Sequence, residues 1–251
     1  MPFNTIADKS LAEFEMRLNA TLRYMEGAIM KELERFPRKA GRIMVGADSF
    51  GQITQMYQNL LLELERSGYP EAVSALQGWD KELIEEIAKD SKVPFQFTQT
   101  SRDTINALRQ IQLNKFDEIG ATAMDAVRDS VTQTILAGRD IGETIDSIRE
   151  QLDTKFKNYA WTYANTTRRD IIQQVQLESA KEYDGELYWQ FFGPDDDVTR
   201  PACSELLERN GGYYTDAERQ EAEAEFADER AFNCRHVFIQ VSKDEYDANV
   251  K

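Results

Sequence analysis

The sequence has few of the residues that build disulfide frameworks and metal clusters. It contains two cysteines, Cys203 and Cys234, and one histidine, His236. A small secreted domain held together by disulfide bonds needs several cysteine pairs, so that class of protein is excluded. Residues 1–4 lack the basic and then apolar pattern of a signal peptide. No apolar run approaches the ~20 residues that a membrane-spanning helix needs. We therefore expect a soluble protein made in a reducing cytoplasm, with no membrane partner.

Positive charge is also scarce. The chain has 30 lysines and arginines against 45 acidic residues, which gives a net charge of -15 and a pI near 4.6. Proteins that bind duplex DNA need clustered basic residues to displace counterions from the phosphates. We therefore do not expect direct sequence-specific DNA binding, and a partner protein with a basic surface fits better. The local exception is a basic cluster of Arg35, Arg38, Lys39 and Arg42.

Apolar residues make up 41% of the 251 residues, enough for a packed core. Before residue 185 they recur at three- and four-residue steps, which predicts amphipathic helices. Ser10 with Glu13 predicts a capping box at the start of the first helix. Residues 94–100 are the best candidate for a linker and hinge. The predicted helices cover about residues 10–36, 49–67, 70–87, 105–138, 143–152 and 159–183.

The pattern changes after Gly185. An aromatic, strand-like segment over 187–192 is followed by an acidic turn, a short helix from Pro201 and a second turn at 210–212. Thr215 with Glu218 predicts a capping box that opens an acidic helix through about residue 228. A β-branched run over 237–241 predicts a closing strand. We therefore predict a mainly α fold: an elongated helical body over 1–185 and a small α+β C-terminal module over 186–251.

The C-terminal module carries an ordered series of motifs. Residues 188–195 read YWQFFGPD, 197–203 read DVTRPAC, 211–215 read GGYYT and 232–236 read FNCRH. This series resembles the C-terminal signature of the phage Mu F-like minor head proteins. In that family an aromatic strand, an Asp-x-x-Thr-Arg-Pro-x-Cys turn and an Asn-Cys-Arg-His (or Cys) segment occur in this order. By motif the resemblance covers the last quarter of the chain, and the preceding helices agree with the family only in their general character.

The resemblance implies a structural role. Members of that family are minor capsid components and act at the portal vertex during head morphogenesis. We therefore expect a virion protein, found in the host cytoplasm during assembly, that is not an enzyme. Its implied partners are the portal protein and the major capsid or scaffold proteins. Some longer relatives carry toxin or enzyme domains after the module, and because Lys251 follows His236 closely we expect none here.

The signature supplies the candidate site residues. We expect one of the loop aspartates to pair with Arg200 or Arg235, because guanidinium binds carboxylate bidentately, and Thr199 to cap the short helix. These contacts would staple the module's loops to its closing strand. The predicted structural motif comprises Asp195, Asp197, Thr199, Arg200, Pro201, Asn233 and Arg235.

Cys203, Cys234 and His236 are candidate metal ligands. Positions 234 and 236 share one face of a strand, and Cys203 lies near a helix start. Zinc normally takes four ligands, and Asp195 or Asp197 is a candidate fourth. Members of the family often have another His or Cys upstream of the Cys-Arg-His segment, where this chain has Ala231 and Phe232. We expect no cofactor, with buried cysteines and a hydrogen-bonded histidine; bound zinc and a disulfide stay open as alternatives.

Two other functions stay open. The first is a small virion-associated metal- or thiol-dependent hydrolase, built on the same two cysteines and histidine. The second is an adaptor that recruits a scaffold or an ejected protein. The sequence contains no phosphate-binding loop, dinucleotide fingerprint or zinc-protease helix.

Overall fold

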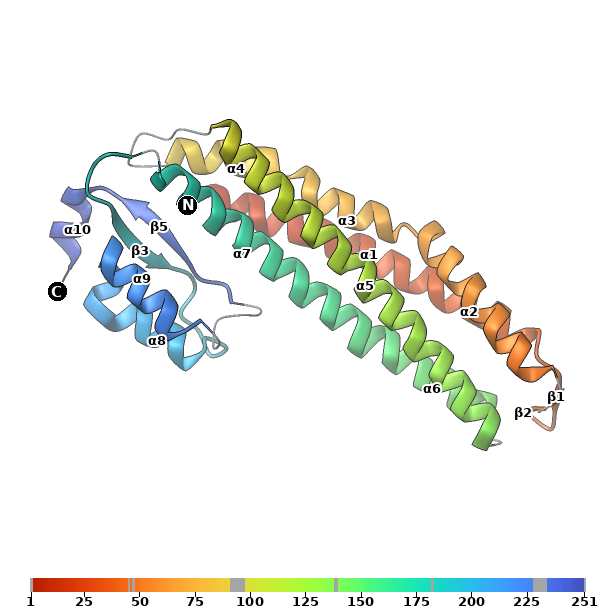
Figure 1. Cartoon of the computed structure of the whole chain (residues 1–251). Helices are drawn as coiled ribbons and strands as arrows, with labels where there is room; N and C mark the ends of the chain where they lie inside the picture. The colour runs from red at the N-terminus through yellow and green to blue at the C-terminus, as the bar shows by residue number, and fades with distance from the viewer. Residues whose placement is uncertain are drawn as a thin grey trace. The chain divides into compact units, whose positions relative to one another are not determined.

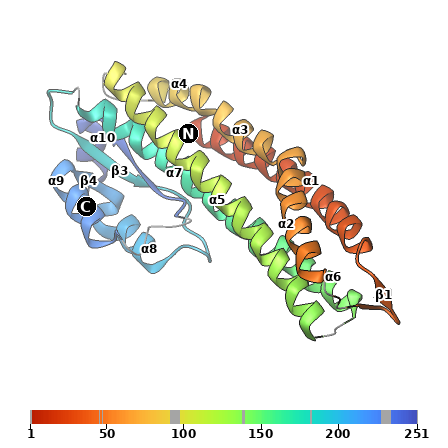
Figure 2. The same ribbon diagram turned by 45° about the vertical axis from the view of Figure 1, so that its right-hand side comes forward.

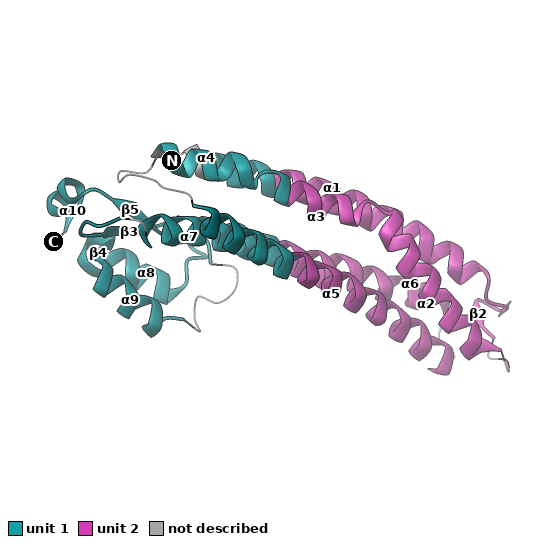
Figure 3. Ribbon diagram, turned by 45° about the horizontal axis from the view of Figure 1, so that its top comes forward, with its two compact units in different colours: residues 1–11, 77–112, 162–251 teal, residues 12–76, 113–161 magenta. Residues whose placement is uncertain are grey.

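The computed structural model describes residues 2–44, 46, 48–90, 98–137, 140–181, 183–227 and 234–250. The chain is mainly α-helical, with a helical body followed by a small α+β module, as predicted. It divides into two compact units that do not follow chain order (Figure 3). Residues 1–11, 77–112 and 162–251 form the first unit, and 12–76 and 113–161 form the second. The predicted boundary between residues 185 and 186 stays a prediction. Within the described helices, none is both long and apolar enough to cross a bilayer.

The second unit is helical and has aromatic side chains in its core. The rings of Phe14 and Phe116 are 5.6 Å apart, and the Tyr69 hydroxyl donates to the Phe116 carbonyl over 2.8 Å. The apolar stripe predicted for the first helix is buried from Phe14 to Leu33. Its elements include parts of α1 (Pro2–Glu34), α3 (Tyr69–Gly78), α5 (Gln99–Ala137) and α7 (Lys157–Lys181), and all of α2 (Ser49–Arg66), α6 (Ile141–Glu150) and a π-helical segment (Gln151–Phe156).

The predicted basic cluster of the second unit lies at a hairpin of two short strands, β1 (Arg38–Lys39) and β2 (Arg42–Ile43). Ala40 and Gly41 form its turn with φ of 50° and 78°, a backbone conformation that glycine adopts without strain. Arg38, Lys39 and Arg42 are exposed. The hairpin therefore presents positive charge to solvent.

Several predicted helix boundaries were wrong. α1 begins at Pro2 and not at Ser10, whose buried hydroxyl donates to the Ala7 carbonyl from inside the helix. The predicted helix over 70–87 is two helices, α3 and α4 (Asp80–Asp90). The predicted helices 143–152 and 159–183 are joined by the π-helical segment. Residues 94–97 of the predicted linker and Gly138 lie outside the described residues, and Gln99 already belongs to α5.

α4 begins at a buried ion-pair network of the first unit. Asp80 is fully buried, and its carboxylate contacts Arg109 of α5 over 2.7 Å and Arg168 of α7 over 2.6 Å. Arg168 is itself 2% exposed. A buried charge must be paired, so this network joins three helices at one point.

The α+β module belongs to the first unit and contains an antiparallel sheet in the order β4-β3-β5. Tyr188 pairs with Val241, and Phe192 with Val237. The predicted strands at 187–192 and 237–241 are confirmed, as is the Thr215–Glu218 capping box. The acidic helix ends at Glu225, and residue 228 lies outside the described residues. The elements, visible in Figures 1 and 2, are β3 (Tyr188–Phe192), α8 (Pro201–Glu208), β4 (Tyr213–Thr215), α9 (Asp216–Glu225), β5 (Val237–Val241) and α10 (Lys243–Asn249).

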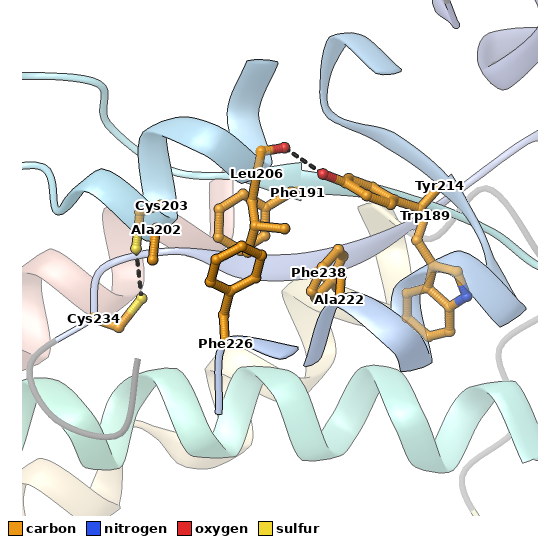
Figure 4. Packing of buried hydrophobic residues seen from close by; sticks show 10 residues of the cluster. All are labelled: Trp189, Phe191, Ala202, Cys203, Leu206, Tyr214, Ala222, Phe226, Cys234 and Phe238. Atoms are coloured by element: carbon orange, nitrogen blue, oxygen red, sulfur yellow. Dashed lines mark hydrogen bonds between the residues drawn. The ribbon is translucent and has the colours of Figure 1, made fainter. Parts of the chain in front are cut away.

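The two faces of this sheet pack into different cores. Val237 and Ile239 of β5 lie in a cluster with apolar residues of α4, α5 and α7. Trp189, Phe191 and Phe238 point the other way and pack with apolar side chains of α8 and α9 (Figure 4). The alternation follows from the two-residue period of a strand. The sheet that contains the signature's aromatic strand therefore lies between these two cores.

The outer edge of β5 is covered by glutamines of α7. The backbone N–H groups of Phe238 and Gln240 donate to the side-chain carbonyls of Gln173 and Gln176, over 3.1 and 3.3 Å. The Gln240 side chain donates in turn to the Gln176 backbone carbonyl over 3.1 Å. These bonds replace the partners that a further strand would have supplied.

Candidate functional site

The signature loop between β3 and α8 is held by hydrogen bonds of its own. The Thr199 N–H donates to the Asp196 carbonyl over 2.8 Å, and the Asp196 N–H donates to the Thr199 hydroxyl over 2.9 Å. That hydroxyl donates to the Pro194 carbonyl over 3.0 Å. The predicted helix cap was wrong, because Arg200 occupies the N-cap position and no side chain caps α8. Thr199 instead closes the loop, and Pro201 begins the helix.

An ion pair links this loop to the segment that enters β5. Arg235 donates through both terminal nitrogens to the Asp196 carboxylate, over 2.8 and 2.5 Å. This hydrogen bonding holds the pKa of Asp196 well below its usual range and raises the pKa of Arg235. The side chains of Arg235 and Asp196 are 35% and 44% exposed, so solvent screens the pair. The pair connects the loop to the closing strand, as predicted, but it contributes less to stability than a buried ion pair would.

The carboxylate in this pair is neither of the two that we named. Asp195 and Asp197 flank Asp196, and both are exposed. The run of three aspartates hid the choice, although the Asp-x-x-Thr spacing of the signature already indicates Asp196, three residues before Thr199. An aspartate can accept hydrogen bonds from the backbone that follows it, and the Asp196 carboxylate accepts from the Val198 N–H over 3.2 Å.

His236 forms a second link to the loop. Its Nε2 lies 2.8 Å from the Pro194 carbonyl oxygen, which can only accept, so Nε2 carries a proton; in the neutral ring the lone pair is then on Nδ1. The ring stacks on Phe191, with centroids 5.2 Å apart and planes 13° apart. A Cβ at Gly193 would lie 2.3 Å from this ring, so only glycine fits there. Phe191 and Gly193, which precede the signature's polar residues, were not predicted to be site residues.

The two thiols meet beside this histidine. Cys203, in the first turn of α8, has its sulfur 3.6 Å from that of Cys234 (Figure 4). The Cys234 sulfur is 4.0 Å from Nδ1 of His236. All three residues are buried, neither cysteine is in a disulfide bond, and the three ligand atoms lie within 4.8 Å of one another. The expectation that the cysteines are buried and the histidine hydrogen-bonded is confirmed.

Two cavities adjoin this cluster. The smaller measures about 100 Å³ and is lined by the three residues of the cluster together with Val198, Thr199, Arg200 and Arg235. The larger measures about 450 Å³ and includes Asn165, Arg168, Arg169, Cys234 and Arg235 in its lining. Among the described residues, no carboxylate joins the cluster, so neither Asp195 nor Asp197 is a fourth ligand.

The arrangement offers two kinds of chemistry. Two thiols and an imidazole nitrogen can bind a borderline-soft cation, and a thiol beside an imidazole can act as a nucleophile. Apart from Asn233, which lies outside the described residues, the predicted residues come from the two segments that meet here. No family model, curated protein or solved structure matches this chain.

Proposed function

We propose that this chain is a phage minor head protein that acts in head assembly at or near the portal vertex and is not an enzyme. The portal protein and the major capsid or scaffold proteins are its proposed partners. The protein would be part of the virion capsid after passing through the host cytoplasm. In this role the helices contact the neighbouring subunits and the signature holds the C-terminal module compact.

The observation that carries the proposal is what the signature residues contact. The resemblance rests on motifs at 188–203 and 232–236, and several of their polar side chains contact one another, although Asp195 and Asp197 are exposed. Asp196 binds Arg235, His236 binds the loop at Pro194, and the two cysteine sulfurs are in contact. Signature residues that contact one another within the module support a structural role better than a catalytic one.

The hydrolase alternative has less support. Its nucleophile would be Cys203 or Cys234, which are 2% and 3% exposed. The smaller cavity, at about 100 Å³, is below the ~300 Å³ at which small-molecule sites begin. Cys234 also lines the larger cavity, so the direct test of the hydrolase alternative is whether Cys234→Ser abolishes an activity.

The test is to produce heads with and without this chain. The portal, scaffold and major capsid proteins of the same genome would be expressed together, and the particles purified by sedimentation. We expect the chain to co-purify with heads at low copy, measured by quantitative mass spectrometry, and portal-containing heads to become fewer without it. Clean heads that lack the chain, and form equally well in its absence, would refute the proposal.

A charge reversal sharpens the test. Arg235→Glu breaks the staple, whereas Glu221→Gln changes an exposed residue of α9 that contacts nothing in the signature. We expect reduced incorporation for the first variant and normal incorporation for the second. A hydrolase would instead show an activity that Cys234→Ser abolishes while incorporation stays normal, and that result would favour the alternative.

A further inference from the structure

The three chemistry-bearing side chains of the module have a geometry close to that of a metal centre. Thiolates bound to one tetrahedral zinc ion, each at ~2.3 Å, lie ~3.8 Å apart, and a thiolate and an imidazole nitrogen lie ~3.6 Å apart. Here the two sulfurs are 3.6 Å apart, and the Cys234 sulfur is 4.0 Å from Nδ1 of His236. Small side-chain movements would place all three atoms around one ion.

The histidine is oriented as a ligand. Imidazoles that bind metals almost always donate their other ring N–H to a carbonyl or carboxylate, which fixes the tautomer. His236 does this with the Pro194 carbonyl, and so its Nδ1 lone pair faces the sulfurs. The ring is also held against Phe191 and fits only because residue 193 has no side chain.

The surroundings suit two thiolates. Arg235 lies between two of the ligands in sequence, and it lines the cavity of about 100 Å³ beside them. Arg200 lines the same cavity. Positive charge near a sulfur favours the thiolate, which is the form that binds metal. Both sulfurs are buried, so a bound ion would be shielded from water on the ligand side.

We propose that Cys203, Cys234 and His236 bind one zinc ion, and that its fourth position faces the cavity of about 100 Å³ and is taken by solvent. The ion would join the first turn of α8 to the segment that enters β5, across 31 positions of sequence. This inference does not depend on the proposed role in head assembly.

The chain makes the experiment unambiguous because it has no other cysteine or histidine. The full-length protein would be purified without chelator or metal-affinity resin and analysed by elemental mass spectrometry. We expect about one zinc per chain. After replacement of zinc by cobalt(II), a thiolate charge-transfer band and intense visible bands typical of tetrahedral cobalt should appear. Azide should shift the visible bands because the fourth position is open, and unshifted bands would overturn that part of the proposal.

Variants test the individual ligands, and a measurement on the wild-type protein excludes misfolding of a variant as the reason for metal loss. Cys203→Ser and His236→Gln should each lose the metal, whereas Asp195→Asn, in the same loop, should keep it. In the wild-type protein, both thiols should react with a thiol reagent at least ~10-fold faster after chelation, because a bound thiolate is protected. Chelation should also lower the melting temperature by about 5 °C or more.

Three results would overturn the proposal. The first is a metal-free protein whose thiols react equally fast with and without chelator. The second is zinc that survives in a Cys203→Ser/Cys234→Ser double variant, which would mark adventitious binding elsewhere. The third is a protein with no reactive thiol until a reductant is added, which would show that Cys203 and Cys234 form a disulfide instead.

Discussion

At the scale of single residues, the site depends on one position that has no side chain. A Cβ at Gly193 would meet the His236 ring at 2.3 and 2.6 Å and its Cα at 3.0 Å. The ring is confined by Phe191 and by its hydrogen bond to Pro194, so it has little room to move. Gly193 therefore matters for space rather than for backbone conformation.

Gly193→Ala should lower the stability of the protein by about 1–3 kcal/mol, the usual cost of overpacking a filled site. Chemical denaturation would measure this loss, and the NMR signals of the single histidine should shift. Gly27→Ala is the matched control, because a Cβ there meets nothing within 4 Å. Gly27 is exposed within α1, so that change should stabilise by roughly 0.5–1 kcal/mol. Equal unfolding midpoints for the Gly193 variant and the wild type would contradict the packing argument.

The Asp196–Arg235 pair makes a prediction about pH. Hydrogen bonding to Arg235 holds the pKa of Asp196 well below its usual range. A carboxyl with a lowered folded-state pKa stabilises the protein above its unfolded pKa of ~3.9, and this stabilisation is lost as the pH falls through the folded-state pKa. The melting temperatures of the wild type and Asp196→Asn should therefore differ by a constant amount above about pH 5. The difference should shrink below about pH 4.

Asp195→Asn is the control for this titration, since that carboxylate is exposed and adjacent. It should follow the wild type at every pH. Because the pair is partly exposed, the difference for Asp196→Asn should be small, and a difference typical of a buried pair would show that solvent does not screen it. A difference that already narrows between pH 7 and 5 would contradict the lowered pKa.

At the scale of elements, the contact between α7 and β5 is made by glutamines as well as by apolar packing. Gln176 and Gln240 are each 4% exposed, and the Gln240 N–H has the Gln176 side chain as its acceptor. A buried donor that loses its acceptor keeps the full cost of leaving water. Removing this acceptor would therefore destabilise the protein by more than the bond length of 3.3 Å alone suggests.

Gln176→Met keeps the side-chain volume but removes the acceptor, and it should cost about 1–3 kcal/mol. Gln220→Met is the matched control, because Gln220 is exposed on α9 and donates to Asp216 one turn earlier in the same helix. Urea unfolding would compare the two, and hydrogen exchange should speed up at the Gln240 amide in the first variant alone. Equal unfolding midpoints for both variants would show that α7 does not anchor β5 in this way.

The elements that were predictable are those with an uninterrupted pattern. The stripe from Phe14 to Leu33 and the alternation in β3 and β5 were visible because spacing alone decides which side chains are buried. α10 was not predicted, because it buries no residue and so has no apolar stripe. β4 was not predicted either, because it is only three residues long and directly follows the turn at 210–212. The pairing of Asp80, at the start of α4, with Arg109 and Arg168 was not predicted, because these residues are distant in sequence.

The site was predictable in its membership and less so in its contacts. Cys203, Cys234 and His236 were identified by residue type, and the structure brings them together. The Asp-x-x-Thr spacing of the signature points to Asp196 among the three consecutive aspartates, but that Asp196 faces Arg235 depends on how the loop turns. Thr199 was misassigned as a helix cap because Pro201 marks the helix start, and the hydroxyl instead closes the loop before it. Local sequence thus indicates candidates, while partners across 39 positions need the fold.

At the scale of the whole molecule, charge makes the remaining prediction. A net charge of -15 should repel duplex DNA at physiological salt, although the hairpin of β1 and β2 exposes Arg38, Lys39 and Arg42. A gel-shift assay should show no micromolar binding. Any binding at low salt should disappear in a Lys39→Glu/Arg42→Glu variant. Micromolar binding that survives moderate salt would contradict the acidic-surface argument.

The glutamines that cover β5 also affect whether other copies of the protein can add strands to this sheet. An open outer strand is a template on which another chain's strand can add, and repeated addition gives fibres. In the described sheet, Gln173 and Gln176 occupy N–H groups of β5, and β4 on the opposite side offers only Tyr213–Thr215. Little backbone of this sheet is left for templated growth, so we expect it to resist the addition of a strand from another chain.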